Sequence, residues 1–117
     1  MRGVLFVAIG GATGSVARYL VSRWFSGDFP WGTFAVNVIG SLLIGLLTGI
    51  VGRGILSDDM KLLLVTGFCG GFTTFSTFAC ESFQMMRAGD ALLSAAHVGI
   101  SVIAGMMAVY AGVKILE

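Results

Sequence analysis

Residues 67–78 read Gly67-Phe68-Cys69-Gly70-Gly71-Phe72-Thr73-Thr74-Phe75-Ser76-Thr77-Phe78, and no other part of the chain constrains the architecture as strongly. The stretch lies in the third of four long apolar segments, where a helix that crosses lipid normally carries Leu, Ile and Val. It holds three glycines, four hydroxyl side chains and four phenylalanines instead. This composition is typical of a helix that is interrupted or very closely packed.

The composition of the whole chain is that of a membrane protein. Of its 117 residues, 56% are hydrophobic and 11% are charged, whereas soluble domains carry about 25% charged residues. At about 20 residues per bilayer crossing, the length allows four helices with short connections. We therefore predict an all-α integral membrane protein, with residues 1–117 forming one transmembrane domain and helices at about residues 4–21, 31–51, 62–86 and 91–115.

Several functional classes are disfavoured by composition. The net charge of +1 gives no basis for nucleic-acid binding. Cys69 and Cys80 are too few for a zinc site or a disulfide framework, and apolar neighbours suggest packed, reduced thiols. One histidine and one carboxylate within the predicted helices make a poor catalytic set, so we expect no enzyme.

Small residues recur four positions apart in every predicted helix, which allows close approach of helix backbones in a membrane. The pairs and triplets are Gly10 and Gly14; Ser41, Gly45 and Gly49; Gly67 and Gly71; and Ser101 and Gly105.

Positive charges are shared unevenly between the two ends of the predicted helices. Arg2, Arg53, Lys61 and Lys114 fall at one end, and Arg23 and Arg87 at the other, with Arg18 near it. This is a weak positive-inside bias. A weak bias permits both orientations in the membrane, and therefore an antiparallel homodimer.

The third segment predicts a broken helix in mid-membrane. Gly70 and Gly71 weaken it by about 1 kcal/mol each relative to alanine, and its hydroxyls compete for backbone groups. Irregular backbone at membrane depth is tolerated only inside protein or along a wet cavity. Carbonyl oxygens freed at such a break suit a hard cation. Because one chain supplies only a few of them, a second copy of the chain would be needed to complete the coordination shell. The alternative is a continuous helix packed through its glycines.

Polar and aromatic side chains of the same region suit a small anion. Phe75 and Phe78 are three apart, and the positive edge of a phenyl ring attracts anions. Ser76, Thr77 and Asn37 offer hydrogen-bond donors. Simple packing of the phenylalanines is the alternative interpretation.

Residues 67–78 resemble the signature of the bacterial fluoride channel family known as Fluc or CrcB. Residues 10–19, 32–40 and 97–101 also match family motifs. The resemblance implies a fluoride-selective channel that passively exports cytoplasmic fluoride, in an antiparallel dual-topology homodimer with two pores in the bacterial inner membrane. It further implies a structural sodium ion, not transported, held by backbone carbonyls of Gly70 and Thr73 from each subunit.

The resemblance also assigns roles to side chains. Those expected along the fluoride path are Asn37, Phe75, Ser76, Thr77, Phe78 and Ser101; those expected at a vestibule are Arg18, Glu81 and His97. Two positions depart from the family, which often has leucine at Phe72 and in some members a hydroxyl at Gly105.

The roles of three side chains each allow two interpretations. Arg18 either snorkels to the headgroups or provides a fixed charge that draws anions. Glu81 is expected to face a vestibule or to be neutralised by a partner, because an anion path should avoid carboxylates. His97 either packs or hydrogen-bonds Ser101 one turn away.

The main rival is a small multidrug-type exporter, which also has four helices. It would need a carboxylate in the first helix for proton coupling, and residues 4–21 contain none. A structural subunit without transport activity is the second rival, and the polar centre of the third segment argues against it.

Overall fold

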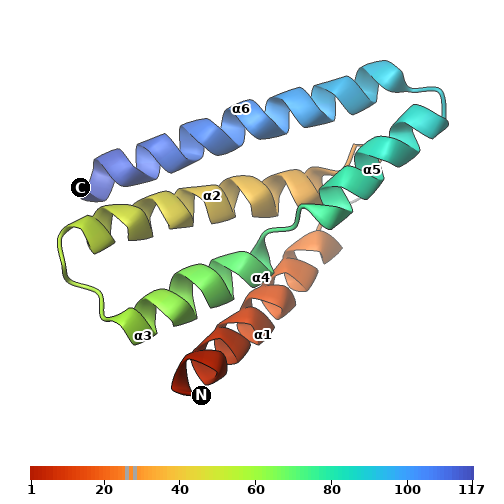
Figure 1. The fold of residues 1–117 in the computed structure, drawn as a ribbon. Helices are drawn as coiled ribbons and strands as arrows, with labels where there is room; N and C mark the ends of the chain where they lie inside the picture. Colours follow the sequence, from red (N-terminus) through yellow and green to blue (C-terminus); the bar gives the residue numbers. More distant parts are fainter. Residues whose placement is uncertain (26, 28) are drawn as a thin grey trace.

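The computed structural model describes residues 1–25, 27 and 29–117, and this part of the chain is helical without any strand (Figure 1). In chain order the elements are α1 (Arg2–Arg23), α2 (Trp31–Gly52), α3 (Asp58–Lys61), the π-helix η1 (Leu62–Cys69), α4 (Gly70–Phe72), α5 (Ser76–Arg87) and α6 (Ala91–Leu116).

Four stretches are long and apolar enough to cross a membrane: Arg2–Arg23, Trp31–Gly52, Asp58–Arg87 and Ala91–Leu116. The prediction of an all-α protein with four membrane-spanning helices is thereby confirmed.

The third stretch begins four residues before the predicted boundary. Ser57 caps α3, its hydroxyl accepting a hydrogen bond from the Met60 amide at 3.2 Å. Asp58 and Asp59 occupy the first turn, where negative charge is favourable. This charged segment is therefore the first turn of a helix, whereas the sequence predicted a loop here.

The helices associate in two closely packed pairs. One pair is α1 against η1 and α4, and the other is α2 along α6 (Figure 1). In the first pair a Cβ added at Gly14 would lie 2.9 Å from the Phe72 nitrogen, and one at Gly71 would lie 2.5 Å from the Gly11 carbonyl oxygen. These are contacts of backbone on backbone, which only glycine permits.

The second pair uses a glycine that the sequence pattern did not single out. A Cβ at Gly112 would lie 2.6 Å from the Leu46 nitrogen, opposite Gly45. Gly105 is less confined, since a Cβ there would meet only the Ser41 hydroxyl oxygen, at 3.5 Å. The tight contact between α2 and α6 is therefore at the Gly45–Gly112 level.

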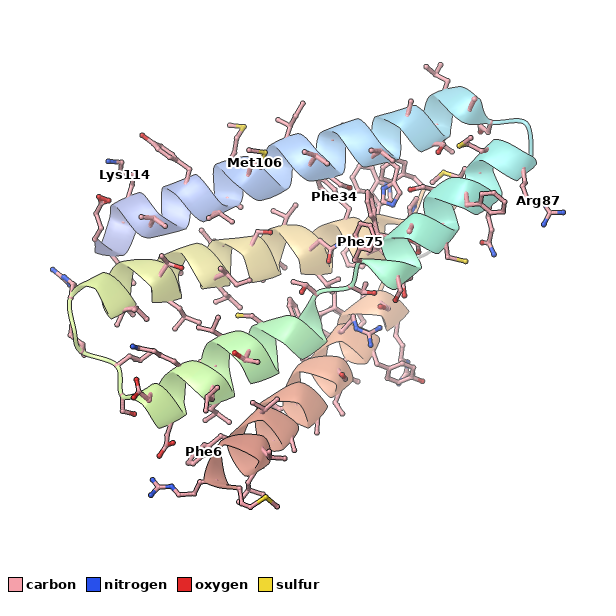
Figure 2. The ribbon with its side chains drawn as sticks, viewed as in Figure 1. Phe6, Phe34, Phe75, Arg87, Met106 and Lys114 are labelled. Carbon is pink, nitrogen blue, oxygen red and sulfur yellow. The ribbon has the colours of Figure 1, made fainter. Side chains whose placement is uncertain are left out.

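The third span changes direction between α4 and α5. Thr73 is extended, with φ −88° and ψ 160°, and helical backbone resumes at Ser76. Beyond this point α5 leaves α1 and packs against α6. Figure 2 shows Phe75 at the start of α5, with Arg87 and Lys114 at opposite ends of the molecule. The Phe75 side chain is 80% exposed.

The glycine contacts predict a sharp difference between two alanine substitutions. Gly14→Ala should destabilise the protein by about 2 kcal/mol or more, because the methyl group meets backbone that cannot yield. Gly99→Ala on α6 has open space around the added Cβ and should be neutral or stabilising by up to about 1 kcal/mol. Thermal unfolding in detergent measures both, and equal stabilities of the two variants would contradict the close packing of α1.

Candidate functional site

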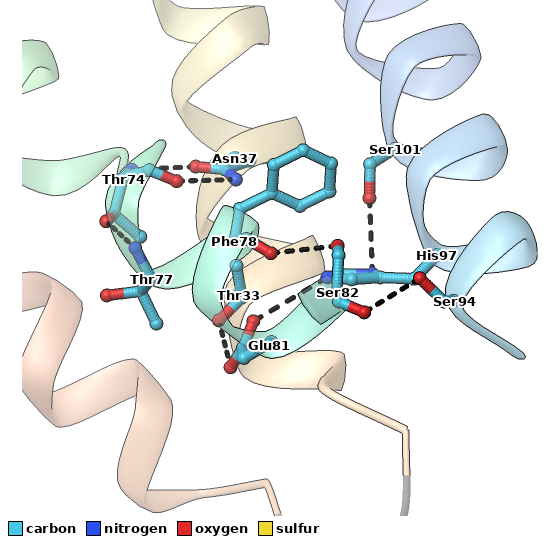
Figure 3. A network of polar contacts seen from close by, with 10 residues as sticks. All are labelled: Thr33, Asn37, Thr74, Thr77, Phe78, Glu81, Ser82, Ser94, His97 and Ser101. Atoms are coloured by element: carbon cyan, nitrogen blue, oxygen red, sulfur yellow. Dashed lines mark hydrogen bonds and ion pairs between the residues drawn. The ribbon is translucent and has the colours of Figure 1, made fainter. Parts of the chain in front are cut away.

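Asn37 on α2 binds the backbone at the interruption through both atoms of its amide. Its Nδ2 donates to the Thr74 carbonyl oxygen at 3.1 Å, and the Thr74 amide donates to its Oδ1 at 2.9 Å (Figure 3). This pair of bonds replaces the helical hydrogen bonds of Thr74. The extended conformation of the chain at this point is therefore held in place from a neighbouring helix.

Two backbone carbonyls lose their usual partners as a result. In a continuous helix the amide of residue i donates to the carbonyl of residue i−4, so Thr74 would donate to Gly70 and Thr77 to Thr73. Instead, the Thr74 amide donates to Asn37 Oδ1, and the Thr77 amide donates to the Thr74 hydroxyl at 3.2 Å. The carbonyls concerned, of Gly70 and Thr73, are the two that we predicted as cation ligands.

Arg18 binds a third carbonyl at the interruption. Its Nε donates to the Gly71 carbonyl oxygen at 3.2 Å, and the side chain is half-buried. The Gly71 carbonyl is partly buried, and because a carbonyl that is shielded from water without a partner is costly, Arg18 stabilises the backbone at this point. The Arg18 side chain therefore reaches the interruption from α1.

A cleft of about 320 Å³ opens beside the interruption. Its lining comes from α2, the segment between α4 and α5, α5 itself and α6: Asn37, Ser41, Ile44, Thr73, Thr74, Phe75, Phe78, Ser101 and Val102. Four of the six side chains predicted along an ion path are thus brought together, namely Asn37, Phe75, Phe78 and Ser101. Ser76 is exposed and outside this lining.

The two phenylalanine rings of the cleft differ in how closely neighbouring side chains pack against them. Phe75 immediately precedes α5 and is largely exposed, with its ring centroid 6.1 Å from that of Phe78. The Phe78 ring meets the His97 ring at an edge, with centroids 4.8 Å apart. Phe78 is therefore held by α6, whereas Phe75 projects from the chain.

Glu81 lies in a polar network of three helices (Figure 3). The Thr33 hydroxyl donates to Glu81 Oε2 at 2.9 Å, and His97 Nε2 stands 3.6 Å from Oε1. The Ser101 hydroxyl lies 3.5 Å from His97 Nδ1, the pairing expected from their spacing. Within the described residues, neither Glu81 Oε1 nor His97 Nε2 has a hydrogen-bond partner. The two atoms are neighbours, but at 3.6 Å they lie just beyond hydrogen-bond distance.

Of the three predicted vestibule residues, the structure brings Glu81 and His97 together and places Arg18 elsewhere. Glu81 lines a second cavity of about 270 Å³ together with Thr33 and Thr77, while His97 is fully buried and does not line it. Arg18 lies at the interruption. Thr33 was missed from the sequence, although it lies one helical turn before Asn37 and on the same face.

Comparison with known sequences assigns this arrangement to a family. The sequence model of the family described as "CrcB-like protein, Camphor Resistance (CrcB)" matches residues 5–113. The chain belongs to the CrcB family. Proteins named fluoride-specific ion channel FluC are similar to it along its whole length. One from Leptospira interrogans is 44% identical over 99% of this chain and 95% of its own.

Two further relatives of the same name show similar agreement. The Rhizobium etli protein is 44% identical over 100% of this chain and 98% of its own. The Phocaeicola vulgatus protein is 41% identical and covers both chains completely. Insertions or deletions large enough to change the architecture are therefore excluded between this CrcB member and these relatives.

The double hydrogen bond of Asn37 predicts the behaviour of two α2 variants. Asn37→Ala removes both partners of Thr74 and should destabilise the protein by about 1–3 kcal/mol, with much faster hydrogen exchange of the Thr74 amide. Ser41→Ala one turn away removes only a bond to the carbonyl of its own helix and should leave that exchange unchanged. Slow exchange at Thr74 in Asn37→Ala would show that the amide has another partner.

Proposed function

We propose that this chain is a fluoride-selective ion channel through which cytoplasmic fluoride leaks out passively. Its family and the names of its relatives support this proposal. One observation of the structure also supports it: Asn37 hydrogen-bonds the interrupted backbone at Thr74, beside the Phe75 and Phe78 rings. A channel of this family is not an enzyme. It is a multi-pass protein, placed in the bacterial plasma membrane.

The functional unit of this proposal is an antiparallel homodimer with two pores. Phe75 is 80% exposed in the single chain, although it lines the cleft. Gly70 is also exposed, and nothing lies within 4 Å of a Cβ added there. Both features sit at the interruption in the third span, where a second copy of the chain would complete the enclosure. The weak charge bias of the sequence permits the opposite orientations that this pairing needs.

A structural sodium ion fits the donors at the interruption. Gly70 and Thr73 offer carbonyl oxygens whose helical amide partners are diverted to Asn37 and to the Thr74 hydroxyl. Neutral oxygen ligands suit hard cations, and two carbonyls from each of two chains would supply a shell. When bound, such an ion supplies a fixed positive charge near the pores.

The side chains of the cleft account for passage of a strongly hydrated anion. A pore must replace the water of the ion without holding the ion too tightly. Phe75 and Phe78 provide positive ring edges. Asn37 Nδ2 has two hydrogens, one bonded to Thr74, so that the second is available to an ion. Larger halides are rejected by the width of the path.

The exporter alternative finds no support in the structure. Proton coupling would need a carboxylate on α1, and Arg2–Arg23 carries none. Glu81 lies on α5 and is engaged by Thr33 and His97.

The proposal predicts selective halide release. Liposomes containing the purified protein and loaded with fluoride should empty rapidly when a potassium ionophore balances charge, as followed with a fluoride electrode. Liposomes loaded with chloride should retain their anion on the same time scale, because the path is too narrow for it. Comparable release of both halides would refute selectivity.

A ring edge that stabilises the ion predicts the effect of Phe78→Ile. Loss of about 1.4 kcal/mol of stabilisation corresponds to about a tenfold fall in fluoride flux, with the dimer intact by size-exclusion chromatography. Phe83→Ile is the matched control, since Phe83 is an exposed residue of the same helix outside the cleft lining. Equal flux in the two variants would remove the Phe78 ring from the mechanism.

A further inference from the structure

A smaller cavity lies between α2 and the start of the third span. It measures about 220 Å³ and is lined by Thr48, Val51, Lys61, Val65 and Thr66. It is located at the end of the molecule that carries both termini and the connection from α2 to α3 (Figure 1). Its polar lining residues are Lys61, Thr48 and Thr66.

This cavity and the cleft at the interruption are both lined by residues from one face of α2. Asn37, Ser41 and Ile44 line the cleft, and Thr48 and Val51 line the smaller cavity. The spacing of these five residues, alternately four and three, places them on one side of the helix. Ile44 and Thr48 are one turn apart, which is about 6 Å along the axis. The two cavities therefore follow each other along one helix face.

The polar groups of the smaller cavity suit a small anion. The Lys61 ammonium has three donors and a side chain that is 40% exposed. Its ion-pair partner Asp58, at 3.5 Å, has a side chain that is 97% exposed, and water screens such a pair strongly. The Thr48 hydroxyl donates to the Ile44 carbonyl at 2.7 Å, so it can turn to a ligand at the cost of one bond.

We propose that this cavity is an outer mouth of the anion path, in which Lys61 concentrates fluoride before it moves along α2 to the interruption. The inference rests on the proposed function and adds a site to it. In an antiparallel pair, each membrane face would present the Lys61 mouth of one copy and the Glu81 cavity of the other. The positive charge of the first would then offset the carboxylate of the second.

Ionic strength provides the test, because a fixed charge attracts anions less as salt screens it. Lys61→Gln should lower fluoride flux about twofold at about 10 mM salt, as expected for one charge at about 10 Å in water. The deficit should vanish in about 1 M of an impermeant salt, where the Debye length is about 3 Å. Lys61→Arg should conduct normally. Lys114→Gln is the control, since Lys114 lies at the same end but outside the cavity.

Chemical restoration of the charge gives a second readout from one folded protein. Lys61→Cys, made in a Cys80→Ser background because Cys80 is exposed, should regain flux with a cationic thiol reagent and lose more with an anionic one. All measurements use vesicles of neutral lipid and are repeated in vesicles that contain anionic lipid. A deficit that appears only with anionic lipid would assign Lys61 to a headgroup and overturn the inference.

The two proposals fail separately. No fluoride release from the unaltered protein would refute the channel. Normal release with no effect of Lys61→Gln at low salt would refute only the mouth.

Discussion

Backbone groups released from a helix inside a membrane must find partners within the protein, because lipid offers none. At the interruption of the third span, these partners come from other parts of the fold. The Asn37 side chain hydrogen-bonds both the amide and the carbonyl of Thr74, and Arg18 donates to the carbonyl of Gly71. The Thr74 hydroxyl accepts a hydrogen bond from the amide of Thr77. The carbonyls of Gly70 and Thr73 lose their helical donors, and this connects the local geometry to the proposed ion and second copy.

The packing of the helices determines where this interruption leads. Glycine contacts bring α1 against η1 and α4, and α2 against α6, so that two pairs of helices are fixed. The change of direction after Phe72 then carries α5 from the first pair to the second. As a consequence Asn37, Phe78 and Ser101, from three different helices, line one cleft. The polar cluster of Thr33, Glu81 and His97 adjoins this cleft through Phe78, whose ring contacts that of His97.

Features that depend on local sequence were predictable. The four spans follow from hydrophobicity and length, and the i, i+4 spacing of His97 and Ser101 allowed their contact as one of two interpretations. Contacts between distant elements were not predictable from one sequence. The partners of Asn37 and of Thr33 are 37 and 48 residues away, and no periodic pattern specifies them. The close contact at Gly112 likewise depends on the neighbouring helix α2, which the sequence does not specify. The start of the third span at Ser57–Asp59 was missed because this polar segment was predicted to be a loop.

The backbone conformation of Thr73 in a lipid bilayer tests the central claim most directly. Solid-state NMR of isotope-labelled protein in membranes yields this torsion angle from chemical shifts and dipolar couplings. The account predicts an extended residue, with ψ near the 160° of the structure. A helical ψ of about −42° at Thr73, continuous with its neighbours, would contradict it.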